Sequence, residues 1–139
     1  MKKVLIALSA TLLAHVLSVP AQSADHIERY VHNGSVIEFV WDTEVREWFE
    51  GTYIKPRKGL SVRRGTRLIS AGYPASGEVS ATVYVFKKGC SPAHYVVNGR
   101  FRGDDLYLSG RAPIREAGGC RVVGYAHTNN SSLVFKRIK

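Results

Sequence analysis

The chain has 139 residues, with 20 Lys and Arg against 11 Asp and Glu and a formal net charge of +9 at pH 7. That length leaves room for one domain with one hydrophobic core. Thirteen glycines and seven tyrosines, with hardly a stretch of Ala, Leu, Glu and Lys at helical spacing after residue 25, argue against a helical protein and favour an all-β one.

Residues 1–23 have the pattern of a secretory signal peptide. Lys2 and Lys3 give a positively charged start, and an apolar run and a set of small residues follow. The apolar run is shorter than the roughly 20 residues of a membrane-spanning helix, and His15 interrupts it. We therefore expect cleavage after one of residues 21 to 24.

The mature protein is then a single β domain over 24–139, periplasmic or secreted, with no transmembrane span. Loss of two lysines leaves 18 basic against 11 acidic side chains, a net charge of +7. A basic surface points to anionic partners and says nothing of the fold.

The first strands surround the clearest turn in the chain. Asn33-Gly34 is the strongest short signal for a hairpin, here between strands over 25–32 and 36–41. In the second strand Ile37, Phe39 and Trp41 share one face, which we expect to point into the core. Residues 45–54 favour another strand because their types prefer β structure, although a short helix capped at Asp42 or Thr43 is an alternative.

A long basic loop follows. Pro56 ends the strand before it, and the segment from Lys55 to Arg67 carries six cations among thirteen residues. We expect these long side chains to project to solvent and to bind anions. They are Lys55, Arg57, Lys58, Arg63, Arg64 and Arg67.

The longest strand signal lies between Gly77 and Cys90. It is apolar on both faces, which predicts a central strand, and it follows a strand over 66–72. One face carries Val79, Ala81, Val83 and Val85, and the other carries Thr82, Tyr84 and Phe86.

The remaining pattern adds strands over 94–101, 106–111, 121–125 and 132–138, with Ala112–Gly119 as a connection and Asn129-Asn130 as the last turn. Eight or nine short strands with a turn every 8 to 12 residues predict a single small antiparallel barrel or sandwich. The C-terminus, which ends in a strand, is expected to lie within the sheet.

Cys90 and Cys120 are the two cysteines, and an oxidising compartment would let them pair. A loop of about 30 residues closed in this way stabilises the fold by roughly 3 to 4 kcal/mol in the chain-entropy model. The spacing is not that of a redox or metal motif. We predict one structural disulfide, with Cα atoms within about 7 Å.

No catalytic or metal-binding motif with specific spacing is present, and no cofactor is expected. The histidines are scattered, and Asp104-Asp105 fits a turn better than a pair of catalytic carboxylates. Trp41 and Trp48 could stack on a sugar, but core packing explains them more simply. Acidic residues between Glu38 and Glu50 precede the basic loop, so an acidic and a basic patch could adjoin.

Several segments carry a resemblance to a known group of proteins. They are spread over most of the mature chain and resemble small exported proteins of alphaproteobacteria. The resemblance implies the compartment and the β fold, and it brings no activity. The segments are Asn33-Gly34-Ser35, Gly65–Leu68, Tyr84–Cys90, Gly110–Pro113, Cys120–Tyr125 and Leu133–Phe135.

These observations favour a non-enzymatic binding module of the cell envelope that holds lipopolysaccharide, an acidic polysaccharide or a protein partner through its basic loop. The alternatives are a small inhibitor of a lysozyme or protease and, third, an enzyme with a site assembled from distant residues. Nucleic acid is not expected as a partner of an exported protein.

Overall fold

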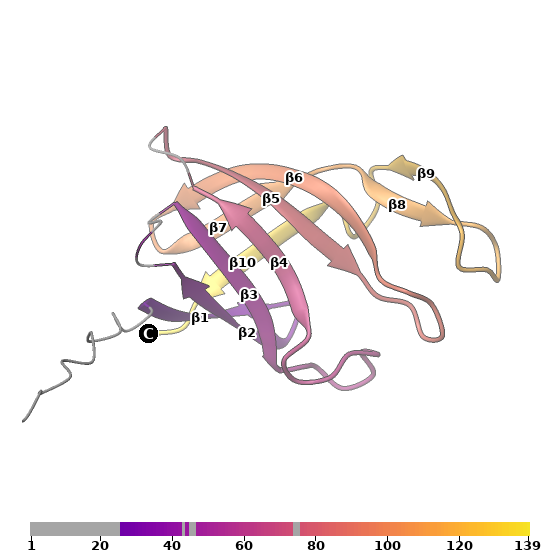
Figure 1. Cartoon of the computed structure of the whole chain (residues 1–139), viewed down its shortest axis with the longest axis horizontal. Helices are drawn as coiled ribbons and strands as arrows, with labels where there is room; N and C mark the ends of the chain where they lie inside the picture. Colours follow the sequence, from indigo (N-terminus) through magenta and orange to yellow (C-terminus); the bar gives the residue numbers. More distant parts are fainter. Residues whose placement is uncertain (1–25, 43, 45–46, 74–75) are drawn as a thin grey trace, which may run out of the picture.

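The computed structural model describes residues 26–42, 44, 47–73 and 76–139, and in these ranges the chain is all-β (Figure 1). The described residues form no helix, and therefore none that could cross a membrane. The expected signal peptide over 1–23 lies outside the described residues, as do part of the acidic turn and part of the turn before the longest strand.

Eight antiparallel strands close into a barrel. Around its wall β1 is followed by β2, β3, β4, β5, β6, β7 and β10, and β10 pairs with β1 to close the sheet. Closure pairs every strand on both sides, which removes exposed edges. The strands are β1 (His26–His32), β2 (Ser35–Trp41), β3 (Trp48–Lys55), β4 (Arg67–Gly72), β5 (Glu78–Val85), β6 (Ala93–Arg102), β7 (Asp105–Ser109) and β10 (Ser132–Arg137).

The sequence left barrel and sandwich open, and the structure is a barrel. A barrel has no central strand, so β5 lies between β4 and β6 as one wall strand among eight. Its predicted apolar face does point inward, since Val79, Ala81 and Val83 are buried. The Asn33-Gly34 turn is confirmed: both residues have positive φ, 48° and 78°, and His32 pairs with Ser35 across it.

The chain leaves the barrel once, for a two-stranded sheet of β8 (Ala112–Arg115) and β9 (Val122–Ala126). Figure 1 shows this hairpin projecting beyond one end of the barrel. One prediction is wrong here: Ala112–Gly119, expected as a connection, includes the strand β8. The strands expected over 121–125 and 132–138 lie in different sheets, since β9 pairs with β8 and β10 belongs to the barrel wall. Pro113 does not prevent the strand because β8 pairs only with β9, and an edge strand tolerates proline.

Aromatic rings fill the barrel interior. Phe39 is at the centre of the stack, with ring centroids 4.3 Å from Tyr30, 4.7 Å from Phe49 and 5.3 Å from Phe135. Gly51 on β3 gives this stack its space, because a Cβ there would come within 2.9 Å of the Phe39 ring. Beyond the packed rings, a pocket lies towards one end of the barrel.

Candidate anion-binding surface and barrel-mouth pocket

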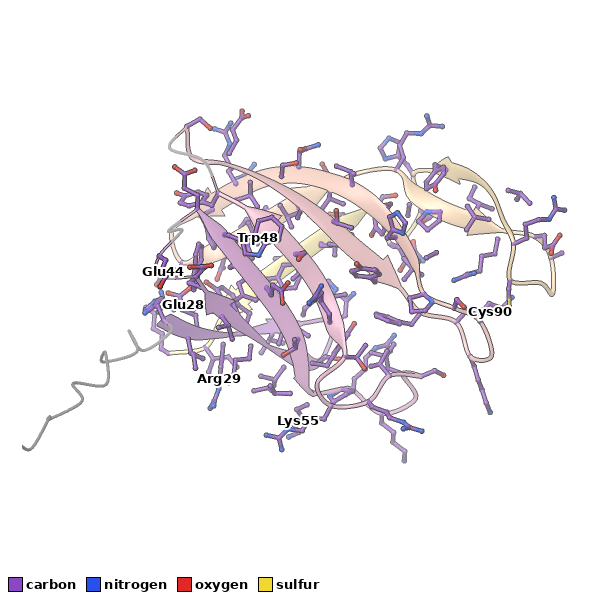
Figure 2. The ribbon with its side chains drawn as sticks, viewed as in Figure 1. Glu28, Arg29, Glu44, Trp48, Lys55 and Cys90 are labelled. Atoms are coloured by element: carbon purple, nitrogen blue, oxygen red, sulfur yellow. A yellow bond between two sulfur atoms is a disulfide. The ribbon has the colours of Figure 1, made fainter. Side chains whose placement is uncertain are left out.

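The connections of an antiparallel barrel alternate between its two ends. Residues 33–34, 56–66, 86–92 and 127–131 lie at one end, which we call the basic end. The described residues of the β2–β3, β4–β5 and β6–β7 connections lie at the other, which we call the aromatic end; they are residues 42, 44, 47, 73, 76–77 and 103–104. Figure 2 shows Lys55 and Cys90 on the side opposite Glu28, Glu44 and Trp48. The predicted basic loop therefore belongs to one end alone.

All six predicted cations are exposed, from Lys55 at the end of β3 to Arg67 at the start of β4. Arg67 forms an ion pair with Glu50, with 3.0 Å between Nη2 and Oε2. The other five form no ion pair with any residue that the structure describes. Their charges are therefore available to an external anion.

The loop over 56–66 is held in place at its base and along its inner side. The Gly65 N–H donates to the Tyr53 carbonyl at 2.7 Å, and the Thr66 N–H donates to the Arg63 carbonyl at 3.1 Å. Leu60 and Val62 pack against the core. With these apolar side chains turned inward, the cations between and beside them are directed to solvent.

The acidic stretch is not a patch beside the basic loop. Glu38 pairs with Arg29 on the barrel wall, at 3.0 Å. Asp42, Glu44 and Glu47 belong to the connection at the aromatic end, and the eight residues of β3 separate them from the loop. At about 3.3 Å per residue that is roughly 25 Å. Adjoining patches were a wrong interpretation, apart from the single contact between Glu50 and Arg67.

Two further lysines belong to the basic end and were missed in the sequence. Lys87 and Lys88 lie in the connection between β5 and β6 and are exposed. Lys87 and Arg63 line one depression of about 470 Å³ between the two loops, with Phe86 and Pro92. More than twenty residues separate these cations in the sequence, so only their shared end of the barrel could have indicated that they line one depression.

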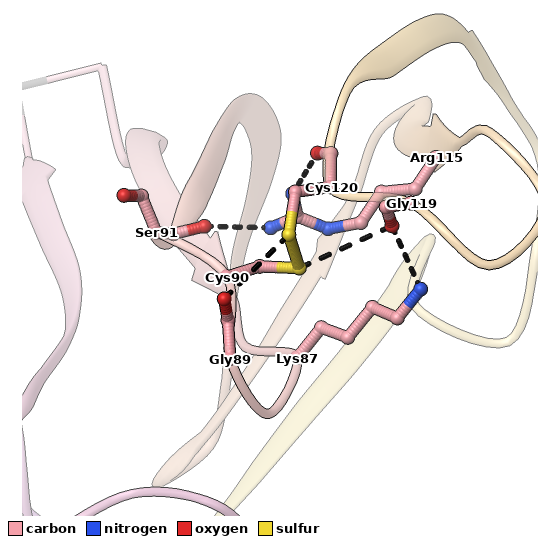
Figure 3. The surroundings of a disulfide bond; sticks show 7 residues. All are labelled: Lys87, Gly89, Cys90, Ser91, Arg115, Gly119 and Cys120. Carbon is pink, nitrogen blue, oxygen red and sulfur yellow. Dashed lines mark hydrogen bonds between the residues drawn. A yellow bond between two sulfur atoms is a disulfide. The ribbon is translucent and has the colours of Figure 1, made fainter.

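The disulfide fastens this second loop. Cys90 and Cys120 are bonded, with an S–S distance of 2.02 Å and Cα atoms 5.3 Å apart, which confirms the predicted pairing. Figure 3 shows that polar contacts surround it: Lys87 donates to the Gly119 carbonyl at 2.8 Å, and Arg115 donates to the Ser91 carbonyl at 2.8 Å. Together these contacts tie the β8–β9 hairpin to the basic end.

A pocket of about 180 Å³ lies at the mouth of the barrel at the basic end. His32 lies in its wall and is buried. Its hydrogen bonds are those of an uncharged imidazole: Nδ1 donates to the Val134 carbonyl at 3.0 Å, and Nε2 accepts from the Asn33 amide at 3.2 Å. Burial lowers the pKa of His32, the bond to Val134 opposes this, and the charge of Arg57 lowers it further.

Two tyrosines, Tyr53 and Tyr95, also belong to the polar part of the wall. Burial raises the pKa of Tyr95 to about 12, and its hydroxyl donates to the Asn130 carbonyl. Burial also raises the pKa of Tyr53 to about 12, while the nearby charge of Arg57 opposes the rise. Tyr53 is only 4% exposed, and its hydroxyl forms no hydrogen bond with any group in the described part of the chain.

The two tryptophans do not form one stacking surface. Trp41 points into the aromatic end, where its ring lies 4.5 Å from that of Phe49. Trp48 precedes Phe49 on β3, so it points to the outside of the wall, and it is 42% exposed. In the described ranges, no group of three or more His, Cys, Asp or Glu side chains gathers as a metal site would require.

Comparison of the chain with protein-family models, with curated proteins and with solved structures gives no match.

Proposed function

We propose that this protein is an exported, non-enzymatic binding module that works in the periplasm or outside the cell. Its basic end holds an anionic component of the envelope, either the phosphates of lipopolysaccharide or an acidic polysaccharide. One observation carries the proposal: five exposed cations without an ion pair among the described residues share one end of the barrel with Lys87 and Lys88.

The physical argument is one of local charge. Exposed cations without carboxylate partners create a positive potential that attracts anions. Two loops anchored by core packing and by the disulfide hold these cations at fixed spacing, so little ordering cost opposes binding. Among the described residues, Glu50 is the one carboxylate that pairs with a cation of the loop, and Asp42, Glu44 and Glu47 lie at the far end of the barrel.

The test is retention of the exported protein on immobilised lipopolysaccharide and on an immobilised sulfated polysaccharide. We expect retention at low salt and release as salt is added, because the screening length falls from about 30 Å at 0.01 M to about 8 Å at 0.15 M. Reversal of three loop cations, in Lys58→Glu, Arg63→Glu and Arg64→Glu together, should abolish retention.

A matched control separates local charge from net charge. Arg102→Glu, Lys136→Glu and Lys139→Glu together lower the net charge by the same six units on exposed residues outside the basic end. This variant should be retained like the parent. Passage of the parent at low salt, or equal loss in both triple variants, would contradict the proposal.

Glu50→Gln should strengthen the binding of anions at the same surface. It removes the carboxylate that pairs with Arg67, so a sixth cation of the loop becomes available. We expect the salt concentration needed for release to rise, while the free energy of unfolding changes by less than about 1 kcal/mol because exposed ion pairs contribute little.

An anchored loop at a barrel end also favours a second candidate, an inhibitor of a protease or lysozyme. A net charge of +7 for the mature chain disfavours a cationic lysozyme. Inhibition assays with the parent and the two triple variants decide between the candidates: loss of inhibition in the loop variant, without anion retention in the parent, would replace the first proposal with the second.

A further inference from the structure

The pocket at the barrel mouth has an imbalance between donors and acceptors. Tyr53 is almost fully buried, but its hydroxyl has no hydrogen-bond partner in the described part of the chain. The Ser35 hydroxyl accepts from the Arg57 N–H at 2.9 Å, which leaves its own proton to be donated. No fully buried side-chain polar atom of the described residues lacks a partner, so the Tyr53 hydroxyl is open to the pocket, where an external acceptor can reach it.

One cation faces the same space. The Arg57 side chain runs past Gly34, where a Cβ would lie 3.8 Å from the Arg57 Cβ, and it lines the pocket without an ion pair among the described residues. His32, in the same wall, adds no charge, because its Nε2 accepts from Asn33. Among the described residues that line the pocket, Arg57 is the one Lys, Arg, Asp or Glu. The site therefore offers one guanidinium together with the hydroxyls of the buried residues Tyr53 and Ser35, whose protons are not donated to any described group.

This donor set matches a carboxylate. A guanidinium binds the two oxygens of a carboxylate through parallel hydrogen bonds, and one positive charge balances one negative charge. A phosphate dianion would bring more charge into the barrel mouth than Arg57 alone balances. The carboxylate class thus fits the pocket better than the phosphate class, although both can bind the exposed loop.

The size of the pocket and its other lining residues indicate what the rest of the ligand would be. A volume of about 180 Å³ lies below the 300 to 1,000 Å³ of pockets for drug-sized ligands. The amides of Asn129 and Asn130 can both donate and accept, as the hydroxyls of a sugar require, and Phe86 with Leu133 offers apolar surface to a ring. The part of the ligand that carries the carboxylate should therefore be a single hydroxylated ring.

We infer that the barrel-mouth pocket binds one sugar acid, through its carboxylate at Arg57, Tyr53 and Ser35. The inference rests on the proposed function for the source of this ligand, which is the terminal residue of an acidic polysaccharide whose following units lie along the basic loop. The pocket then supplies selectivity for carboxylated sugars, and the loop supplies attraction that any anion shares.

The experiment is a titration of the isotope-labelled exported protein with sodium glucuronate, followed by the amide NMR signals of Tyr53 and Arg57 at constant ionic strength. Glucose serves as the uncharged match and inorganic phosphate as the alternative anion. We expect a saturable shift with glucuronate and at least tenfold weaker binding of glucose and phosphate. No saturable shift, or equal binding of phosphate, would overturn the inference.

Tyr53→Phe is the sharpest variant, because the hydroxyl it removes has no described partner in the protein, so the fold should persist. Glucuronate should bind at least fivefold more weakly to it. Arg57→Gln should weaken binding at least tenfold. Lys58→Gln, which removes the same charge one residue outside the pocket lining, should bind glucuronate within twofold of the parent. An unchanged affinity in Tyr53→Phe would refute the pocket assignment.

The two proposals fail in different ways. Retention on polysaccharide with no response to glucuronate would reject the pocket and leave the basic surface. A saturable response to glucuronate without retention of the parent on either column would reject the proposed function, and with it the polysaccharide as the source of the ligand.

Discussion

At the aromatic end of the barrel the Glu28 carboxylate has several partners within the chain, whereas at the basic end the side chains of Tyr53 and Arg57 have no polar partner among the described residues. The Glu28 carboxylate shows the first condition: it accepts from the Tyr30 hydroxyl at 2.6 Å and from the Trp41 indole at 3.3 Å, and it pairs with Arg137 at 2.9 Å. At the basic end, Tyr53 and Arg57 have no such partner among the described residues.

The two ends are also closed by different means. Rings of Trp41, Phe49, Tyr73 and Phe101 pack against one another at the aromatic end, with centroids 4.5 to 6.4 Å apart. The basic end is held by two packed loops and by one covalent bond. A self-satisfied end contributes stability, while an end with unpaired donors is the place to expect a ligand.

The largest expected effect concerns the covalent bond. Cys90→Ser with Cys120→Ser should lower the free energy of unfolding by about 3 to 4 kcal/mol, because the bond closes a loop of 30 residues in the unfolded chain. The β8–β9 hairpin should then show faster amide hydrogen exchange, while exchange at the aromatic end follows only the global change. Equal protection of the hairpin before and after the substitution would show that the disulfide does not anchor it.

The next effect compares one ring at each end. Trp41→Ala should lower the free energy of unfolding, measured in urea, by about 3 kcal/mol, because it leaves a cavity among packed rings and removes a donor to Glu28. Phe86→Ala, at a half-buried ring beside the existing pocket, should cost about 1 kcal/mol. Similar costs at both positions would remove the distinction between a packed end and an open one.

The smallest expected effect is a difference between the two ends in the pH range over which each loses stability. Burial lowers the pKa of His32, so the unfolded chain binds its proton more readily, and stability should begin to fall as the pH drops below 6.5. Burial would raise the pKa of Glu28, but bonds from Tyr30 and His26 and the charge of Arg137 together lower it. The contribution of Glu28 to the free energy of unfolding is fully present above pH 4.5, and it is lost as the pH falls through the pKa of Glu28 in the folded state.

Urea unfolding between pH 3 and pH 8 should therefore show two windows of lost stability. His32→Gln should flatten the upper window, at the basic end, and Glu28→Gln should flatten the lower one, at the aromatic end. A single window that both substitutions change alike would mean that the two ends titrate as one unit.

The local features of the chain were decided by the sequence itself. Asn33-Gly34 predicts its turn because Gly34 takes a positive φ at no steric cost and Asn33 tolerates one. Alternation predicts the inward faces of β2 and β5, since side chains on a strand alternate between its two sides. Two cysteines in a chain with a signal peptide pattern permit one pairing, and the structure has it.

What depends on pairing between distant strands was decided by the tertiary structure alone. Closure of the barrel depends on β10 lying between β1 and β7, far from both in the sequence, and no local pattern indicates this. The same closure places Lys87 in the lining of one depression with Arg63, and Tyr53 in one pocket with His32 and Arg57. It also set the acidic connection apart from the basic loop, because a strand carries its two ends to opposite sides of the molecule.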